Sequence, residues 1–237
     1  MNEMLTVQIE RGGYAENETI ISNICFQVQP GELVGLIGAN GAGKSTTLQA
    51  IMGTLPIMDG EIHSASYGYV PERPILYEYF TLWEHIDFLI RTIDGDEEQL
   101  TERAMDLCRT FRLESKLYEY PTSFSKGMQQ EVMLILAFLP DRRLYILDEP
   151  FMGLDPQAIR RLLTMIDEYK TRGAAILMST HALDTAERIC DAFVLVDSGR
   201  ILHKGTLSSF REKLHDHSAT LLDIFDRFLE DGEHGAI

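Results

Sequence analysis

The segment from Gly38 to Ser45 constrains the fold most, because it matches the pattern G-x-x-x-x-G-K-[ST]. The apolar run at residues 33–37 predicts a strand before it, and residues 44–52 predict a helix after it. Glycines let the backbone wrap tightly, so that successive N–H groups face one phosphate group, and the helix N-terminus adds a favourable dipole. The pattern predicts a nucleotide-phosphate loop, in which Lys44 binds the β- and γ-phosphates and Ser45 offers its hydroxyl to Mg²⁺.

Two adjacent acids follow a second apolar run, at residues 144–147. Ligands of open α/β sheets bind at the carboxyl ends of the strands, so acids at that place can meet a cation or a reacting group. We predict that Asp148 holds Mg²⁺ directly or through water. Glu149, one residue further, is a candidate general base that polarises the attacking water. Acids at a strand exit carry little information alone, but beside a phosphate loop they predict nucleotide hydrolysis.

The order of the expected elements predicts an α/β fold. Residues 5–37 suggest three strands and residues 60–70 two more. From about residue 74 to residue 140 the apolar spacing is helical, and strands and helices alternate again from residue 144. A βαβ pattern with a helical insert predicts a mostly parallel sheet with a helical lobe. The tail from Thr206 also has helical spacing; we expect it to pack on the core, with a dimer contact as the alternative.

Charge and cysteine usage disfavour several classes of protein. The chain has 237 residues with 37 acids and 21 bases, and its net charge of −16 disfavours nucleic acids and anionic lipid surfaces as partners. The longest apolar run, at residues 132–139, is shorter than the roughly 18 residues of a membrane span, and the N-terminus lacks a secretory pattern. The three scattered cysteines fit a reducing compartment. We therefore expect a cytosolic location and no nucleic-acid partner.

With these motifs in this order, the chain resembles the nucleotide-binding subunits of ABC transporters over essentially its whole length. Residues 124–128 (Phe-Ser-Lys-Gly-Met) stand where the family signature Leu-Ser-Gly-Gly-Gln is expected. Residues 153–155 resemble the loop that couples the two sites of a dimer. Tyr14 resembles the aromatic residue that stacks on adenine, with a turn tyrosine after Gly12 and Gly13 as the alternative. His181, 32 residues after Glu149, resembles the histidine that hydrogen-bonds the γ-phosphate.

The resemblance implies ATP and Mg²⁺ as cofactors and assigns a role to each motif residue. The residues with catalytic roles would be Lys44, Glu72, Glu149 and His181. The nucleotide contacts would come from Tyr14, Gly38, Asn40, Gly41, Gly43, Lys44, Ser45, Thr46, Ser125, Gly127 and Asp155, the signature residues acting on the ATP of the opposite subunit. The Mg²⁺ site would comprise Ser45, Glu72 and Asp148.

The resemblance also implies the ABC ATPase fold. This is an α/β P-loop core with a mostly parallel sheet, an N-terminal antiparallel β subdomain and a helical lobe. It implies one domain over residues 1–237. The ATP-binding core would take residues 1–73 and 141–205, the helical lobe residues 74–140, and a C-terminal helical tail residues 206–237.

Two departures from the family pattern are informative, one within the signature and one after Pro71. Lys126 replaces a glycine and Met128 a glutamine of the signature, whereas Ser125 and Gly127 keep the hydroxyl and the close backbone approach that an anion needs. Lys126 could add charge toward phosphate or point into solvent. Glu72 replaces a glutamine after Pro71; its carboxylate can still accept bonds from water or bind Mg²⁺, but it adds negative charge and cannot donate when ionised.

The segments Val-Pro-Glu-x-Pro at residues 70–74 and Leu-Tyr-Glu at residues 76–78, with the signature, resemble the Ecs-type branch of bacterial ABC transporters. That resemblance implies an ATPase subunit that powers a transporter, taken here as an exporter, through a head-to-tail dimer at the cytoplasmic face of the cell membrane. A separate integral membrane subunit would dock near Tyr77 and Tyr79. Trp83 fits that contact and the core of the helical lobe equally well.

Three alternatives remain open at this point. The first is a soluble ABC protein that acts on ribosomes or DNA, but the chain has neither a second ATPase module nor a coiled-coil insertion. The second is a weakly hydrolysing regulatory module, which the altered signature favours and the intact Lys44, Asp148, Glu149 and His181 oppose. The third is a P-loop GTPase or small-molecule kinase, which lacks support because the sequence has no Asn-Lys-x-Asp motif.

Overall fold

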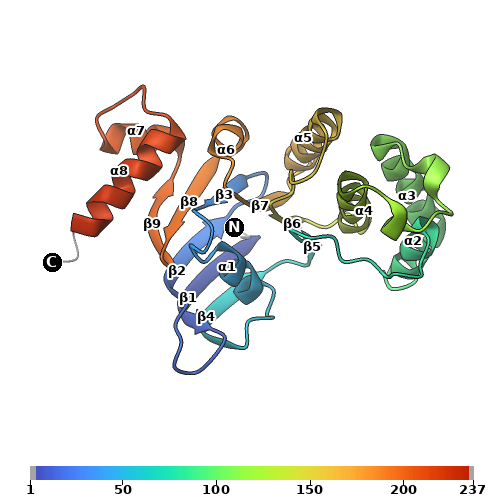
Figure 1. Ribbon diagram of the computed structural model, residues 1–237, viewed down its shortest axis with the longest axis horizontal. Helices are drawn as coiled ribbons and strands as arrows, with labels where there is room; N and C mark the ends of the chain where they lie inside the picture. Colours follow the sequence, from blue (N-terminus) through green and yellow to red (C-terminus); the bar gives the residue numbers. More distant parts are fainter. Residues whose placement is uncertain (1–3, 235–237) are drawn as a thin grey trace.

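A six-stranded sheet forms the centre of the molecule in the computed structural model, which describes residues 4–234 (Figure 1). Its first five strands are parallel and its edge strand β9 is antiparallel to β8. In spatial order the strands are β5 (Tyr67–Val70), β6 (Leu144–Asp148), β7 (Ala175–Thr180), β3 (Leu33–Ile37), β8 (Ala192–Asp197) and β9 (Arg200–Gly205). The inner strands β3, β6 and β7 are buried at every position, which explains their uninterrupted apolar runs.

A second, three-stranded sheet is antiparallel and lies beside the first. It has the order β2 (Ile21–Val28), β1 (Leu5–Gly13) and β4 (Ile57–Ser64). Helix α1 (Lys44–Ile51) packs with both sheets, and one apolar cluster joins Val7 and Ile24 of the small sheet to Leu48 of the helix and Leu177 of the large sheet. This shared core holds the phosphate loop, which directly precedes α1, rigidly between the sheets.

The regular elements between residues 74 and 140 are helices, and they lie at one end of the molecule (Figure 1). The elements are α2 (Leu82–Ile90), α3 (Glu97–Phe111), the short 3₁₀ turns η1 (Glu114–Lys116) and η2 (Pro121–Ser123), and α4 (Lys126–Phe138). Thr81 and Glu84 form a capping box that starts α2. The apolar cluster of these helices continues through Val70 and Leu147 into the sheet and through Leu162 into α5 (Pro156–Thr171), so the helical segment shares a core with the sheet.

The C-terminal helices lie at the opposite end (Figure 1). Helices α7 (Leu207–Lys213) and α8 (Leu221–His234) pack on β8 and on α6 (Leu183–Ile189) through a cluster that includes Phe193, Phe210, Ile224 and Phe225. The tail therefore packs on the core, as the sequence predicts.

The α/β fold class is confirmed, and the structure has one strand, β9, that the sequence did not predict. Strand β9 was not predicted, because its mixed sequence Arg-Ile-Leu-His-Lys-Gly does not alternate clearly. It forms a hairpin with β8 through Ser198 and Gly199, which both have positive φ (47° and 75°). No described helix is long and apolar enough to cross a membrane. The domain limits remain a prediction, and their ends at residues 1–3 and 235–237 lie outside the described residues.

Candidate nucleotide site

Three motifs that are far apart in the sequence meet at one edge of the large sheet. Strands β3, β6 and β7 are parallel neighbours, so the segments that follow them lie together at their carboxyl ends. They surround a cavity of about 400 Å³. Ten of the predicted site residues line it: Asn40, Gly41, Gly43, Lys44, Ser45, Thr46, Glu72, Asp148, Glu149 and His181.

The phosphate loop needs glycine at two kinds of position. Gly41 and Gly43 have positive φ (82° and 102°), a conformation that costs other residues free energy. At Gly38 a Cβ would lie 2.4 Å from the backbone oxygen of Val196, so only glycine fits. The β8–β9 turn supports the loop as well, because Gly199 donates its N–H to the carbonyl of Ala42 at 2.9 Å.

Lys44 folds back onto the loop. Its Nζ donates to the carbonyl oxygens of Gly38 at 2.7 Å and Ala39 at 3.1 Å, and the side chain is buried. Burial lowers the pKa of Lys44, while Glu149, Asp148 and Glu72 oppose the shift. These contacts keep the ammonium group at the bottom of the loop, where a bound phosphate would replace the carbonyls as its partner.

Asp148 is the most strongly buried acid of the cavity. It accepts a hydrogen bond from the Ser179 hydroxyl at the end of β7. Burial raises the pKa of Asp148, and Glu72 and Glu149 raise it further, while the Ser179 hydrogen bond and Lys44 lower it. Three carboxylates thus face one lysine, an excess of negative charge that a divalent cation would balance.

The oxygen donors of the cavity suit Mg²⁺. The Ser45 hydroxyl and the carboxylates of Glu72 and Asp148 are hard ligands of the kind that Mg²⁺ prefers. Within the described residues, no three His, Cys, Asp or Glu side chains are close enough to form a metal cage. Mg²⁺ usually takes one or two carboxylates and completes its shell with water and phosphate oxygens.

Glu149 and His181 form a pair across the cavity. The Nδ1 atom of His181 lies 2.7 Å from Oε1 of Glu149, and Thr180 donates its hydroxyl to Oε2 at 3.3 Å. The backbone of Glu149 is in the left-handed region (φ 46°) and donates its N–H to the Ser179 carbonyl at 3.1 Å. Its carboxylate is therefore held by two residues at the end of β7, with one oxygen on the histidine.

Tyr14 does not line the cavity but touches its wall. Its hydroxyl donates to Oε1 of Gln49 at 2.8 Å and lies 3.3 Å from Oγ1 of Thr46, which does line it. Tyr14 is 48% exposed, so an aromatic surface beside α1 is available for stacking.

Ser125, Gly127 and Asp155 lie together, away from this cavity. Ser125 caps α4 by accepting the N–H of Met128 at 3.3 Å, and Asp155 caps α5 through the N–H groups of Gln157 and Ala158. These two bonds, the one from Ala158 first, lower the pKa of Asp155. The two helix starts touch at Gly127, where a Cβ would lie 2.5 Å from the carbonyl oxygen of Gly153.

Sequence reasoning missed two residues of the cavity wall, Ile20 and Met152. Met152 lies three residues after Glu149, between two predicted motifs, so its position was a usable signal. Ile20 lies in the turn before β2 and belongs to no motif. Gly199 links this turn to the phosphate loop, because it accepts the N–H of Ser22 at 2.8 Å and donates its own N–H to Ala42. Only the packing of the small sheet against the loop reveals it.

Known proteins are similar in sequence to nearly the whole chain. The family model described as ABC transporter matches residues 21–152. The chain is 46% identical over 228 residues to the uncharacterized ABC transporter ATP-binding protein YthP of Bacillus subtilis (strain 168), covering 95% of this chain and 96% of YthP. It is 42% identical over 235 residues to the ABC-type transporter ATP-binding protein EcsA of the same strain, covering 94% and 95%.

A solved structure described as the ATP binding subunit of an ABC transporter has the same fold. It superimposes with a TM-score of 0.91 at 40% identity and covers 95% of this chain and 99% of that chain. The predicted family and fold are therefore confirmed. The chain belongs to the ATP-binding subunits of ABC transporters, in the Ecs-type branch, and is an ATP hydrolase of that family.

Proposed function

We propose that the chain binds MgATP in the cavity described above, hydrolyses it, and thereby powers an exporter in the membrane. The observation that carries this proposal is the joining of the phosphate loop, Asp148 and the Glu149–His181 pair at one sheet edge. The ring of Tyr14 stacks on adenine, and the backbone N–H groups of the loop bind the β-phosphate. Export as the direction is in keeping with the Ecs-type resemblance.

Lys44 leaves the carbonyls of Gly38 and Ala39 when phosphate arrives and neutralises charge on the β- and γ-phosphates. Ser45, Asp148 and Glu72 hold Mg²⁺, which supplies positive charge to the transferring phosphoryl group. Glu149 accepts a hydrogen bond from the attacking water and holds it in line. His181, fixed by Glu149, donates toward the γ-phosphate. Positioning therefore supplies most of the rate.

A second copy of the chain completes each site. Ser125 and Gly127 do not line the cavity of their own chain, yet they present a hydroxyl and a helix N-terminus that suit an anion. We propose that they meet the γ-phosphate held by the partner in a head-to-tail dimer. Asp155, on the loop that touches Gly127, then links the two sites.

The membrane subunit docks on the helical segment at the cytoplasmic face of the membrane. Tyr77 and Tyr79 are 56% and 80% exposed, and Tyr77 lines a groove of about 410 Å³ with Ile75 and Phe88. Trp83 is partly buried against the core, so it supports the helical segment and is not proposed as a contact. Apolar side chains exposed in this number suit a protein partner.

Replacement of Glu149 by Gln tests the assignment of the site. The variant should keep MgATP affinity, lose turnover by about a hundredfold or more, and accumulate as an ATP-bound dimer. Turnover by steady-state phosphate release and mass by analytical ultracentrifugation measure both effects. Glu168→Gln, on the exposed face of α5, is the matched control and should behave as the wild type. Undiminished turnover of Glu149→Gln would remove its assigned role.

Replacement of Lys44 by Ala tests the binding step separately. It removes the charge at the bottom of the loop, so the MgATP dissociation constant should rise by about tenfold or more. Isothermal titration calorimetry measures this constant without any need for turnover. Normal affinity would contradict the assignment of the phosphate loop.

A further inference from the structure

The helix that follows His181 is short and weakly started. Helix α6 begins two residues after His181, at Leu183, and has only seven residues. No side chain caps its N-terminus: Ala182 stands in the cap position, and its own N–H donates to Oγ1 of Thr180. An isolated helix of this length is unstable in water. Its position must therefore come from what packs on it.

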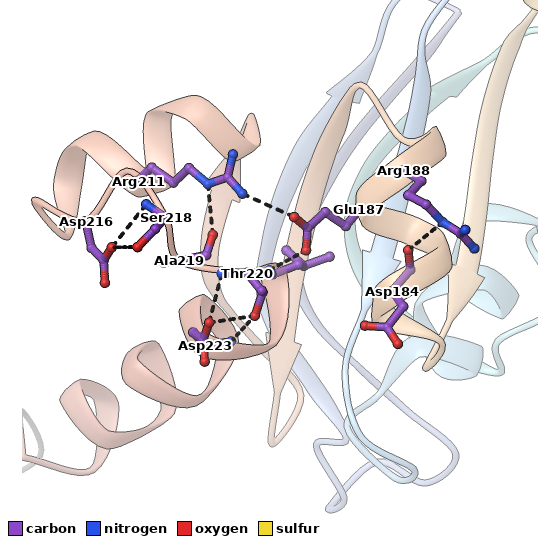
Figure 2. A network of polar contacts seen from close by, with 10 residues as sticks. Asp184, Glu187, Arg188, Arg211, Asp216, Ser218, Ala219, Thr220 and Asp223 are labelled. Carbon is purple, nitrogen blue, oxygen red and sulfur yellow. Dashed lines mark hydrogen bonds and ion pairs between the residues drawn. The ribbon is translucent and has the colours of Figure 1, made fainter.

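One carboxylate on α6 connects it to the C-terminal helices. Oε2 of Glu187 accepts the N–H of Leu221, the first residue of α8, at 2.7 Å. Oε1 of Glu187 accepts a hydrogen bond from Nη2 of Arg211 on α7 at 3.2 Å. Nε of Arg211 donates to the carbonyl oxygen of Ala219 at 2.8 Å. Figure 2 shows the side chain of Glu187 pointing from α6 toward the α7–α8 connection, where it meets the side chain of Arg211.

The neighbours of Glu187 on α6 make no such connection. Arg188 donates from Nε to the carbonyl of Asp184 in the same helix, and Figure 2 shows both on the side of α6 away from α7 and α8. Beside Glu187, Ala186 is fully buried in the apolar cluster of the tail. The contact between α6 and the tail thus combines the apolar side chains of Ala186 and Leu183 with one carboxylate.

Helix α8 does not need Glu187 in order to begin. Thr220 and Asp223 form a reciprocal cap, in which Asp223 accepts the N–H of Thr220 at 2.9 Å and Thr220 accepts the N–H of Asp223 at 3.2 Å. Glu187 adds a charge-assisted bond to a free N–H group at the positive end of a longer helix. The bond therefore fixes α6 against an element that is already stable.

We infer that Glu187 is a positioning residue for His181, and that the C-terminal helices set the turnover rate through it. This inference rests on the proposed role of His181. Because α6 follows His181 directly, a helix that is free to move would let the imidazole leave Glu149 and the γ-phosphate. Loss of the Glu187 bonds should then slow the chemical step, while the phosphate loop, and with it ATP binding, stays as it is.

The kinetic test uses the full chain with Glu187→Gln, which keeps the shape and the packing of the side chain. We expect kcat to fall about tenfold and KM for MgATP to change little. Arg211→Gln should give a fall in the same direction. Glu212→Gln is the matched control, since Glu212 is exposed next to Arg211 and its side chain makes no hydrogen bond or ion pair within the described part of the chain. An unchanged kcat in Glu187→Gln overturns the inference.

A cycle with His181→Ala separates positioning from general stabilisation. If Glu187 acts through His181, Glu187→Gln should cause no further loss in the His181→Ala background. An equal further loss there would show a merely structural role and overturn the inference. A wild-type kcat in His181→Ala itself would contradict the proposed function, which distinguishes the two failures.

Amide hydrogen exchange gives a readout that needs no turnover. In Glu187→Gln we expect faster exchange at residues 181–189 and unchanged exchange in α1 and α4. Glu212→Gln should leave all three regions unchanged. Equal protection of residues 181–189 in the wild type and Glu187→Gln would overturn the inference even if kcat had fallen.

Discussion

At the scale of single residues, the site holds more negative charge than a stable interior favours. Asp148 is 6% exposed and faces Glu72 and Glu149, and burial raises its pKa. A carboxyl group with a raised pKa in the folded state stabilises the fold only while it is protonated. Its contribution is complete below the unfolded value near pH 4 and is lost as the pH rises through the folded value. At neutral pH, Asp148 therefore destabilises the nucleotide-free protein.

Replacement of Asp148 by Asn should stabilise the nucleotide-free protein and abolish turnover. The amide oxygen can still accept the Ser179 hydroxyl, while the buried charge is removed. We expect the unfolding midpoint at pH 7.5 to rise by about 2–4 °C, the change that about 1 kcal/mol produces in a chain of this size. The gain should shrink as the pH falls toward about 4.

Thermal unfolding across this pH range, without and with Mg²⁺, measures the effect of Asp148→Asn. Asp167→Asn, on the exposed face of α5, is the matched control and should leave the midpoint unchanged at every pH. A lower midpoint in Asp148→Asn at pH 7.5 would mean that Lys44 stabilises the carboxylate by more than burial costs it.

The site residues that belong to a sequence motif were predictable from the sequence. Gly41, Gly43, Lys44 and Asp148 follow from a motif, and the structure places them around one cavity. The contacts of Lys44 with the carbonyls of Gly38 and Ala39 were not predictable, because no pattern records where a flexible cation rests without its ligand. The hydrogen bond that Leu221 donates to Glu187 was not predictable either, because it joins residues 34 positions apart on two separate helices.

At the scale of elements, a helix start is readable where the sequence offers a cap. Helix α5 starts at Pro156, directly after its cap Asp155. Strand β9 is different: it is an edge strand whose residues are half-buried or exposed, so neither face imposes a clear alternation. Its only signal is the turn at Ser198–Gly199, which sequence reasoning did not use.

The contact between the starts of α4 and α5 makes Gly127 a test of element packing. Alanine normally stabilises a helix by roughly 0.5–1 kcal/mol relative to glycine. Here the added Cβ would lie 2.5 Å from the carbonyl oxygen of Gly153, so the loop before Asp155 must move. We expect Gly127→Ala to lower the unfolding midpoint by about 2–4 °C, as measured by calorimetry.

Lys126→Ala is the matched control for Gly127→Ala. It adds the same residue to the same helical turn, at an exposed position, and should raise the midpoint slightly or leave it unchanged. If Gly127→Ala raised the midpoint as well, the close approach to Gly153 would not constrain the two helix starts.

At the scale of the whole molecule, the proposed function gives one chain two half-sites. The phosphate cavity lies at the strand ends, and the Ser125–Gly127 segment lies outside it. A head-to-tail pair would bring each cavity against the signature of the other chain, yet each chain has a formal net charge of −16 before any ATP is bound. Two such molecules repel each other at long range, and the contacts around the nucleotide must overcome that repulsion.

Added salt should therefore strengthen the dimer. Between about 0.05 and 0.3 M KCl the Debye length falls from roughly 14 Å to 6 Å, which screens repulsion between the two surfaces more than the contacts buried around ATP. For Glu149→Gln at saturating MgATP, we expect the dimer dissociation constant from analytical ultracentrifugation to fall over this range. The wild type with ADP should stay monomeric throughout, which excludes salting-out. A dissociation constant that rises with salt would mean that exposed ion pairs across the interface, with Lys126 as the first candidate, outweigh the net charge of the two chains.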